Sequence, residues 1–375
     1  MAKVKFDDIA RECRNTFKGD KNDVAIVGLE HIVPNEMLVK DYEVDAETTF
    51  SKSFKKGQIL FGRRRAYQQK AGVATFDGIC SGDITVIEAI PGKVDKDLLP
   101  FIIQNERFFD HAVQGSAGSL SPRVKWEHLA SYEFDLPPLN EQKILADKLW
   151  AAYRLKESYK KLLAATDEMV KSQFIEMFGN PLSQVQRYPL EKLGDCCELN
   201  PRRPSISLSD TDMVSFVPMP CVSENGYLQD VAEEEYGKVK KGFTYFENND
   251  VLFAKITPCM ENGKGAIAQE LTNGIGMGST EFHVLRPVEG KSNSYWLLAL
   301  TRMPIFRERA SKNMSGTGGQ KRVGAPFLDN FMVGLPPIEE QNRFERIYKQ
   351  ADKSKFELRK SIDAIDAVIK SLINN

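Results

Sequence analysis

Short apolar runs alternate with turn-forming residues through two long stretches of the chain. The runs are GQILFG (57–62), ITVIEAI (84–90), DVLFAKI (250–256) and FHVLRP (282–287). Their length and their Ile, Val and Phe content are typical of β-strands, and the Gly- and Asn-rich segments between them are typical of turns. Two further segments, 96–113 and 293–310, have helical patterns. Each stretch is therefore predicted to be a compact α+β domain.

A different periodicity follows each stretch, because apolar residues then recur in alternating steps of four and three. The positions along this seam are Leu145, Leu149, Ala152, Lys156, Tyr159, Leu163, Thr166, Val170 and Gln173, and then Phe344, Tyr348, Ala351, Lys355, Leu358, Ile362, Ile365, Ile369 and Leu372. Such spacing predicts two long helices with narrow apolar faces that pack on each other. The alternative is that each helix packs only on the domain before it.

The chain repeats itself, and the phrase LPPLNEQ (136–142) returns as LPPIEEQ (335–341), 199 residues later. Upstream correspondences keep the same order in both copies. They are FDDIARE (6–12) with LEKLGDC (190–196), VAIVGLEHI (24–32) with VSFVPMPCV (214–222), and KKGQILFGRRR (55–65) with ENNDVLFAKIT (247–257). We therefore predict a duplicated unit, each copy being a domain followed by a helix. The boundaries are a first domain at 1–138, a helix at 139–180, a second domain at 181–337 and a helix at 338–375.

Composition places the chain among ordinary globular proteins. It has 375 residues, 42% hydrophobic and 27% charged, with a formal net charge of −1. Six cysteines without a CxxC pair and four scattered histidines give no zinc or disulfide pattern. The start of the chain has no apolar signal region, and no run is long enough to cross a membrane. We expect a soluble cytoplasmic protein with no metal site.

Local charge is more informative than net charge, because each copy carries a basic cluster. Candidate DNA-contacting residues in the first copy are Lys55, Lys56, Arg63, Arg64, Arg65, Tyr67, Gln68, Lys70, Ser116, Ser119 and Arg123, and in the second Lys255, Thr257, Lys264, Lys312, Thr317, Gln320, Lys321 and Arg322. Arg and Gln can contact base edges, whereas Lys mainly contacts phosphate. Ser116 to Arg123 and Thr317 to Arg322 lie in Gly-rich turns that can approach a phosphate. The alternatives are a solvated basic face and a flexible connection.

The chain resembles the specificity subunit of type I restriction–modification systems over essentially its full length. The resemblance rests on residues 57–87, on LPPLNEQKILADKL (136–149), on MFGNP (177–181) and on LPPIEEQ (335–341). It implies two target-recognition domains that each read half of a split double-stranded DNA sequence. It also implies that the two helices form an antiparallel coiled coil, which sets the spacing of the half-sites and docks two methyltransferase subunits. Restriction subunits with motor and nuclease activity complete such a complex.

The resemblance implies no chemistry in this chain, so S-adenosylmethionine, ATP and Mg are expected on partner subunits. The chain itself shows no adenine-methyltransferase motif, no Walker A motif and no nuclease core. Two other functions remain open, a scaffold that docks proteins and a stand-alone nucleic-acid enzyme. A specificity subunit of a methylation-only or related phage-defence system is a variant of the first prediction.

The two copies differ most in their basic segments, where RRRAYQQKAG (63–72) becomes KITPCMENGKG (255–265). This difference predicts two unlike half-sites and hence an asymmetric target. The near-neutral net charge adds the hypothesis that the chain holds DNA weakly until partner subunits enclose it.

Overall fold

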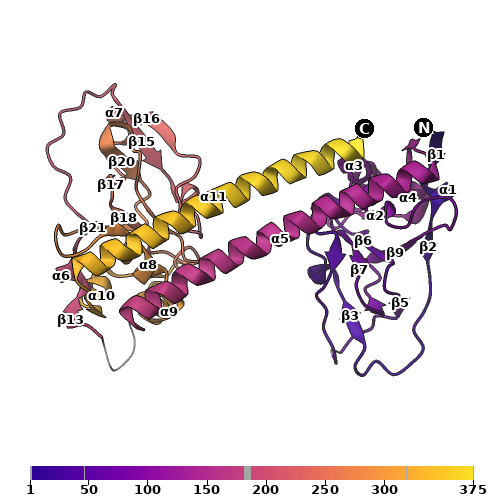
Figure 1. The fold of residues 1–375 in the computed structure, drawn as a ribbon, viewed down its shortest axis with the longest axis horizontal. Coiled ribbons are helices and arrows are strands. Elements are labelled where there is room, and N and C mark those ends of the chain that lie inside the picture. The colour runs from indigo at the N-terminus through magenta and orange to yellow at the C-terminus, as the bar shows by residue number, and fades with distance from the viewer. Residues whose placement is uncertain (1, 46, 181–186, 318, 375) are drawn as a thin grey trace. The chain divides into compact units, whose positions relative to one another are not determined.

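The computed structural model describes residues 2–45, 47–180, 187–317 and 319–374, and the chain forms two compact units (Figure 1). Unit 1 comprises Met1–Lys160 and Arg359–Asn375, and unit 2 comprises Lys161–Leu358. Two long helices, α5 (Leu139–Phe178) and α11 (Ile338–Asn374), each contribute residues to both units. A unit is therefore a globular body together with one part of each long helix.

Unit 1 is built around a five-stranded sheet and a three-stranded sheet. Its strands are β1 (Ala2–Lys5), β2 (Ala10–Cys13), β3 (Ala25–Val27), β4 (Leu38–Val39), β5 (Lys52–Phe54), β6 (Ile59–Gly62), β7 (Ala71–Ala74), β8 (Gly78–Cys80), β9 (Ile84–Ala89), β10 (Ser116–Ala117), β11 (Arg123–Val124) and β12 (Glu133–Leu136). Its short helices are α1 (Phe6–Ile9), η1 (Leu29–His31), η2 (Ala66–Gln68), α2 (Leu99–Ile103), α3 (Glu106–Gln114) and α4 (Trp126–Ala130). The sheet orders are β2-β9-β6-β7-β4 and β3-β8-β5, with two-stranded pairs β1-β12 and β10-β11.

Unit 2 repeats this plan. Its strands are β13 (Leu190–Lys192), β14 (Cys197–Leu199), β15 (Met213–Val217), β16 (Ala232–Glu235), β17 (Thr244–Glu247), β18 (Val251–Ala254), β19 (Gly265–Ile267), β20 (Ile275–Gly278), β21 (Phe282–Pro287), β22 (Met314–Ser315), β23 (Arg322–Val323) and β24 (Met332–Gly334). Its short helices are α6 (Leu193–Cys196), η3 (Met219–Cys221), α7 (Tyr236–Val239), η4 (Thr272–Gly274), α8 (Ser294–Arg302), α9 (Pro304–Lys312) and α10 (Ala325–Asp329). The sheet orders are β14-β21-β18-β19 and β16-β15-β20-β17, with pairs β13-β24 and β22-β23.

The predicted duplication is confirmed strand by strand. The order β2-β9-β6-β7 has its counterpart in β14-β21-β18-β19, and β3-β8-β5 has its counterpart in β15-β20-β17. Each copy has the equivalent parallel contact, β3 with β8 or β15 with β20, and unit 1 has a second one between β4 and β7; the other pairs named here are antiparallel. The predicted strands in GQILFG, ITVIEAI, DVLFAKI and FHVLRP are β6, β9, β18 and β21.

Three local predictions need correction. FDDIARE does not align with the start of LEKLGDC, because Phe6 and Leu193 both begin a buried helical turn and donate to Tyr132 O and Phe331 O. Each of the helical segments 96–113 and 293–310 consists of two helices, α2 with α3 and α8 with α9. The Gly-rich turns are two-stranded hairpins, β10-β11 and β22-β23.

The long helices begin and end where local chemistry requires it. Pro137 and Pro138 precede α5, and a proline is tolerated only in the first turn of a helix. Past its end, Gly179 has a φ of +80° and donates to Ile175 O, which satisfies one of the last carbonyls of α5. Between these ends α5 holds 40 residues without Pro or Gly.

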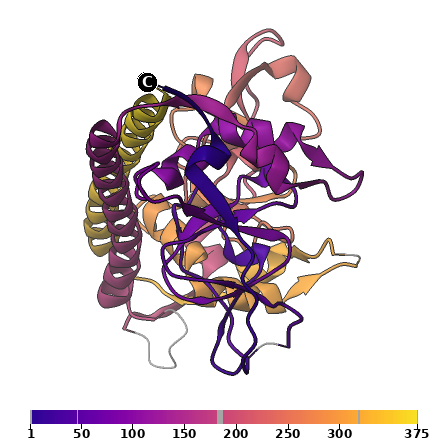
Figure 2. The same cartoon turned by 90° about the vertical axis from the view of Figure 1, so that its right-hand side faces the viewer.

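Both long helices pack into the core of each unit. In unit 1 the buried cluster around Phe61 and Phe108 includes Leu149 and Tyr153 of α5, with Ile369 of α11 packed against it. Figure 2 shows the last turns of α11, marked by the C label, beside α5 in this unit. In unit 2 the core around Trp296 contains Val170, Phe174 and Phe178 of α5 and Phe344, Tyr348 and Ala351 of α11. Packing of each helix only on its preceding domain is therefore wrong.

The seam prediction is right in outline and wrong in detail at the ends of α5. All the predicted seam positions are buried or half-buried. Toward the end of α5, however, the buried apolar positions are Val170, Phe174 and Phe178, at steps of four, and Gln173 is only half-buried. In the first half Tyr153 is more deeply buried than Ala152. The seam drifts because these ends pack on a globular body as well as on the other helix.

Candidate nucleic-acid interface

In unit 1 the basic loop and the Gly-rich hairpin form one surface. The loop 63–70 connects β6 to β7, and the hairpin is β10-β11. Val124 N–H donates to Arg63 O at 3.0 Å, and Arg65 N–H donates to Pro122 O at 2.8 Å. The two predicted DNA-contacting segments, some fifty residues apart in sequence, are thereby joined along their backbones.

Unit 2 makes the same junction with different side chains. Val323 N–H donates to Lys255 O at 2.9 Å, and Thr257 N–H donates to Lys321 O at 3.0 Å. The loop 255–264 between β18 and β19 thus lies against the β22-β23 hairpin as the loop 63–70 lies against β10-β11. We call these two surfaces the loop–hairpin surfaces of unit 1 and unit 2. The backbone frame is conserved between them, whereas Arg63–Arg65 is replaced by Lys255, Ile256 and Thr257.

One arginine of each hairpin pairs with a carboxylate that immediately precedes a strand, β9 in unit 1 and β21 in unit 2. Arg123 Nε donates to Asp83 Oδ1 at 2.6 Å, and Arg322 Nη2 lies 2.8 Å from Glu281 Oε1. The hydrogen bond from Arg123 lowers the pKa of Asp83, and that from Arg322 lowers the pKa of Glu281. Arg123 and Arg322, both predicted to contact DNA, are therefore also oriented by the protein.

The three consecutive arginines have unequal surroundings. Arg64 approaches Asp83 Oδ2 at 3.4 Å and donates to Ser121 Oγ at 2.9 Å. The Nε atoms of Arg63, Arg64 and Arg65 are buried and have no hydrogen-bond partner among the described residues. Arg65 also has a φ of +55°, a left-handed backbone conformation uncommon outside glycine. Among the described residues, the guanidinium groups of Arg63 and Arg65 have no acceptor.

Several other candidate residues share the loop–hairpin surfaces. Tyr67 projects from η2 with 57% of its surface exposed, and Gln68 follows it half-buried. Lys70 and Lys264 occupy equivalent positions, because Gly62 N–H and Ala254 N–H donate to their carbonyls. The hairpin residues Ser119, Thr317, Gln320 and Lys321 are exposed, whereas Ser116 Oγ donates to Ala112 O.

Lys55 and Lys56 lie at the other end of β6 from the loop 63–70, and Lys312 belongs to α9, outside the loop and the hairpin strands. Lys55 and Lys56 precede β6 and Arg63 follows it, so the strand separates the two parts of the sequence cluster. Lys55 Nζ and Lys56 N–H both contact Asp77, at 2.8 Å. Lys312 is the last residue of α9 and pairs with Glu308 one turn earlier. Residues that are close in sequence were therefore predicted to share a surface, but in the structure they lie at opposite ends of β6.

The last residue of each LPP-x-x-EQ phrase is a buried glutamine that joins the long helix to its body. Gln142 Oε1 accepts from Asp95 N–H at 2.8 Å, and its amide donates to Pro137 O. Gln341 Oε1 accepts from Asn293 N–H at 3.0 Å, and its amide donates to Pro336 O and Lys291 O. Sequence reasoning missed this role, although the repetition of the phrase was the signal.

Two lysines of the seam form equivalent ion pairs between the long helices. Within unit 1, Lys156 of α5 lies 2.5 Å from Asp366 of α11, and within unit 2, Lys355 of α11 lies 3.0 Å from Asp167 of α5. The partners of one pair are each 199 residues from their counterparts in the other. In both units a lysine of one long helix therefore meets an aspartate of the other.

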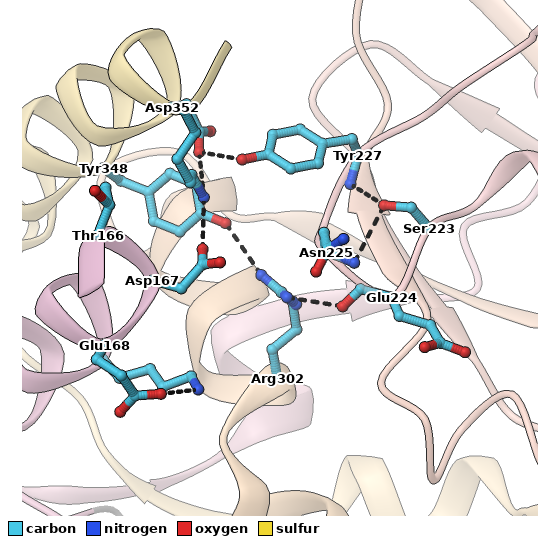
Figure 3. Close-up of polar contacts among 12 residues, drawn as sticks. Thr166, Asp167, Glu168, Ser223, Glu224, Asn225, Tyr227, Arg302, Tyr348 and Asp352 are labelled. Carbon is cyan, nitrogen blue, oxygen red and sulfur yellow. Dashed lines mark hydrogen bonds and ion pairs between the residues drawn. The ribbon is translucent and has the colours of Figure 1, made fainter. Parts of the chain in front are cut away.

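The pair in unit 2 belongs to a larger cluster (Figure 3). Lys355 also contacts Asp352 at 2.9 Å and lies 5.1 Å from the ring centre of Tyr227, whose hydroxyl donates to Asp352. Burial lowers the pKa of Lys355, but Tyr227 and Asp352 outweigh it and raise the pKa above its usual value. Arg302 Nη2 donates to Glu224 O at 2.8 Å in the same view. The loop 223–228 of the body is thus tied to α11.

In unit 1 the body also contacts a long helix, but here the body supplies the carboxylate and α5 supplies the tyrosine. Glu36 of the body accepts from Tyr153 at 3.2 Å and from Lys160 at 2.6 Å, both on α5. In unit 2 the body supplies the tyrosine and α11 supplies the carboxylate. Tyr153 and Asp352 are 199 residues apart, so the same helix position holds a tyrosine in one copy and a carboxylate in the other.

The described residues contain neither a metal-binding cluster nor a membrane-crossing helix. No group of three or more His, Cys, Asp or Glu side chains is placed to hold a metal ion there. His111 and His128 stack with ring centres 4.1 Å apart, and each contacts the carbonyl of the other. None of the helices in those residues has the length and apolarity that a membrane crossing needs.

The chain matches the family model described as the type I restriction modification DNA specificity domain twice, at residues 4–165 and 190–365. The chain belongs to this family. Each match covers one body and most of the long helix after it. The repeat seen in the sheets is thus a repeat of the family's domain.

Two Escherichia coli proteins are among its relatives. The chain is 34% identical to the type I restriction enzyme EcoAI specificity subunit over 233 residues, and 32% identical to the EcoEI specificity subunit over 235. Each match covers 58% of this chain and 39% of the relative. The aligned part is thus well under two thirds of either relative's length.

A solved structure shares the fold. The S subunit of a type I restriction–modification system from M. genitalium superposes with a TM-score of 0.58 at 12% identity, covering 99% of this chain and 94% of that one. The arrangement of two mixed α and β bodies with long helices is therefore the fold of a specificity subunit.

Proposed function

We propose that this chain is the non-catalytic DNA-recognition subunit of a type I restriction–modification complex, and that each loop–hairpin surface reads one half of a bipartite duplex sequence. The observation that carries the proposal is the repeated frame with unlike side chains. In both units the same backbone hydrogen bonds join the basic loop to the hairpin. A shared frame with different residues suits two domains that bind the same kind of ligand and distinguish different sequences.

The side chains divide into two roles on chemical grounds. The side chains of Arg63 and Arg65 have no partner within the described ranges, and Arg can bond two acceptors on a guanine edge. Lys321 and Lys255 present point charges suited to phosphate. Thr257 and Gln68 can accept and donate, and therefore suit base edges. The side chains of Lys55 and Lys312 pair with carboxylates, and Lys55 and Lys56 lie at the other end of β6 from Arg63, so we assign these three lysines no base contact.

We further propose that α5 and α11 pair as an antiparallel coiled coil that acts as a spacer. Support comes from the two lysine–aspartate pairs, which join opposite ends of the helices in the two units. The seam residues Leu145, Leu149, Tyr159, Leu163, Val170, Phe344, Tyr348, Leu358, Ile362, Ile365 and Ile369 form its apolar face. At 1.5 Å per residue, the 40 residues of α5 measure about 60 Å.

The complete complex is proposed to include two methyltransferase subunits docked on these helices and restriction subunits that join them. S-adenosylmethionine, ATP and Mg would be bound by those partners, and the complex would act in the cytoplasm, where the DNA is. The modest basic excess of each surface supports the hypothesis that the chain alone holds DNA weakly.

The experiment is a comparison of duplex binding by the full chain, alone and with a methyltransferase subunit. We expect a preference for one bipartite sequence over its scrambled version, with tighter binding in the assembled complex. Equal binding to scrambled DNA in both cases would leave the protein-docking scaffold as the better function. Equal tight binding by the isolated chain would overturn the hypothesis of weak intrinsic affinity.

A further inference from the structure

Unit 1 contains an open cavity beside its loop–hairpin surface. Of the residues predicted to contact DNA, Arg63 alone is among those that line this cavity. Its volume is about 720 Å³. Its walls come from the end of β2, the segment before β5, the end of β6 and the start of α4. These walls are adjacent because Thr16 bridges to Lys52 and Val124 N–H donates to Arg63 O. The cavity is thus continuous with the proposed DNA surface.

Several of the side chains that line the cavity are polar and make no hydrogen bond to other described residues. Asn15, Thr16, Thr49 and Ser51 line the cavity with amide and hydroxyl groups. Over the described ranges, which omit residue 46, none of these four side chains has a hydrogen bond or an ion pair. Each can both donate and accept hydrogen bonds. Groups of this kind distinguish bases by their edges, whereas a phosphate site needs only donors and positive charge.

Charge on the cavity wall favours a polyanion. Four basic and two acidic residues line it, namely Arg14, Lys52, Arg63, Lys125, Glu12 and Glu127. Glu12 is itself paired with Arg14 at 2.7 Å, which offsets its charge. Arg63 lines the cavity, and its side chain has no hydrogen bond or ion pair among the described residues, so its guanidinium group can bind an incoming acceptor.

We propose that this cavity is the base-reading site of unit 1, in which Asn15, Thr49, Ser51 and Arg63 contact base edges of the first half-site. The inference rests on the proposed function and names residues that determine sequence preference. Trp126, which also lines the cavity and packs on Phe6, supplies a fixed apolar wall against which a base or thymine methyl group can lie. Lys125 on the cavity wall positions the DNA backbone.

The test is selection from a library of random-sequence duplexes on the full chain at low salt. The wild-type chain is compared with Asn15→Ala, Ser51→Ala and the matched control Asn140→Ala, an exposed residue that does not line the cavity. We expect the two cavity variants to lose preference, by about tenfold, at one or more positions of the first half-site. The second half-site and the gap should stay unchanged, as should the whole selection by Asn140→Ala.

Three results would overturn the inference. An unchanged first half-site in both cavity variants would show that the cavity reads no base, as would be expected if it held a protein partner. Equal weakening of both half-sites would show that the substitutions act on general affinity or folding. If the wild-type chain selects no sequence either alone or with its methyltransferase subunit, the proposed function fails first. If it selects a bipartite sequence that the variants leave intact, only this inference fails.

Discussion

The two seam lysines occupy equivalent positions and have different surroundings. Lys156 pairs with Asp366 and keeps 14% of its side chain exposed, whereas Lys355 pairs with Asp167 and Asp352 and keeps 2%. The pair in unit 2 is further enclosed by Tyr227 and Tyr348. Duplication therefore preserved the contact between the helices while each body developed its own way of resting on them.

Of the predictions made here, replacing each lysine in turn should give the largest difference in unfolding free energy between the two units. Lys355→Met leaves Asp167 and Asp352, with 36% and 26% of their side chains exposed, close together without their shared cation, which should cost about 2 kcal/mol of unfolding free energy. Lys156→Met breaks a half-open pair, which should cost under about 1 kcal/mol. Chemical denaturation of the full chain, followed by amide exchange in each unit, measures both. Equal losses would contradict the difference in burial.

The buried glutamines should show the opposite behaviour, because their contacts match in the two units. Gln142→Ala and Gln341→Ala each remove hydrogen bonds to buried backbone groups and should each cost about 2 kcal/mol. The exposed residues Asn140 and Glu339, also 199 positions apart, serve as alanine controls and should change stability little. A strong effect in one unit only would show that the repeated phrase has two roles.

The hairpin arginines test the comparison in DNA binding. Arg123→Gln and Arg322→Gln should each weaken binding of duplex DNA, with a loss of about one unit from the salt dependence of the binding constant. The measurement is a salt titration of affinity for the full chain. Since Asp83 and Glu281 orient these arginines, Asp83→Asn and Glu281→Gln should have smaller effects of the same sign. Salt slopes that stay at the wild-type value would assign both arginines to structure alone.

The smallest expected difference concerns pH. Burial lowers the pKa of His283 from its ordinary value of 6.5, and the equivalent position in unit 1 is Thr85. The unfolded state therefore binds more protons below pH 6.5, so unit 2 should lose stability as the pH falls through that value. His283→Gln should reduce this loss without changing unit 1. Exchange protection measured in both units at pH 7 and pH 5 tests the sign.

The features that repeat along the chain could be predicted from the sequence, whereas those that depend on packing between distant segments could not. The strands, the long helices and the order of the units follow from periodicity and from the 199-residue offset, and the structure bears them out. Lys55 and Arg63 were grouped because they are near in sequence, but strand β6 lies between them and places them at its opposite ends. The drift of the seam toward Phe174 and Phe178 depends on packing against Trp296 and its neighbours, which no local pattern contains.

The candidate site shows the same limit. Arg63, Arg123 and Lys321 could be chosen from charge and from Gly-rich context. Asn15, Thr49 and Ser51 carry no such signal, because they are ordinary polar residues in loops until the fold places them around one cavity. The buried Gln142 and Gln341 were visible as a repeated phrase, but their role required the contacts with Asp95 and Asn293.

The central claim is that the two units read two unlike half-sites, and mapping of methylated bases tests it most directly. The comparison is between cells that carry the wild-type gene with its partner subunits and cells in which the chain bears Arg63→Ala and Arg65→Ala. We predict methylation at one asymmetric bipartite sequence in the first cells, and loss of preference in one half-site only in the second. A continuous motif, or a motif that the substitutions leave unchanged in both halves, would contradict the account.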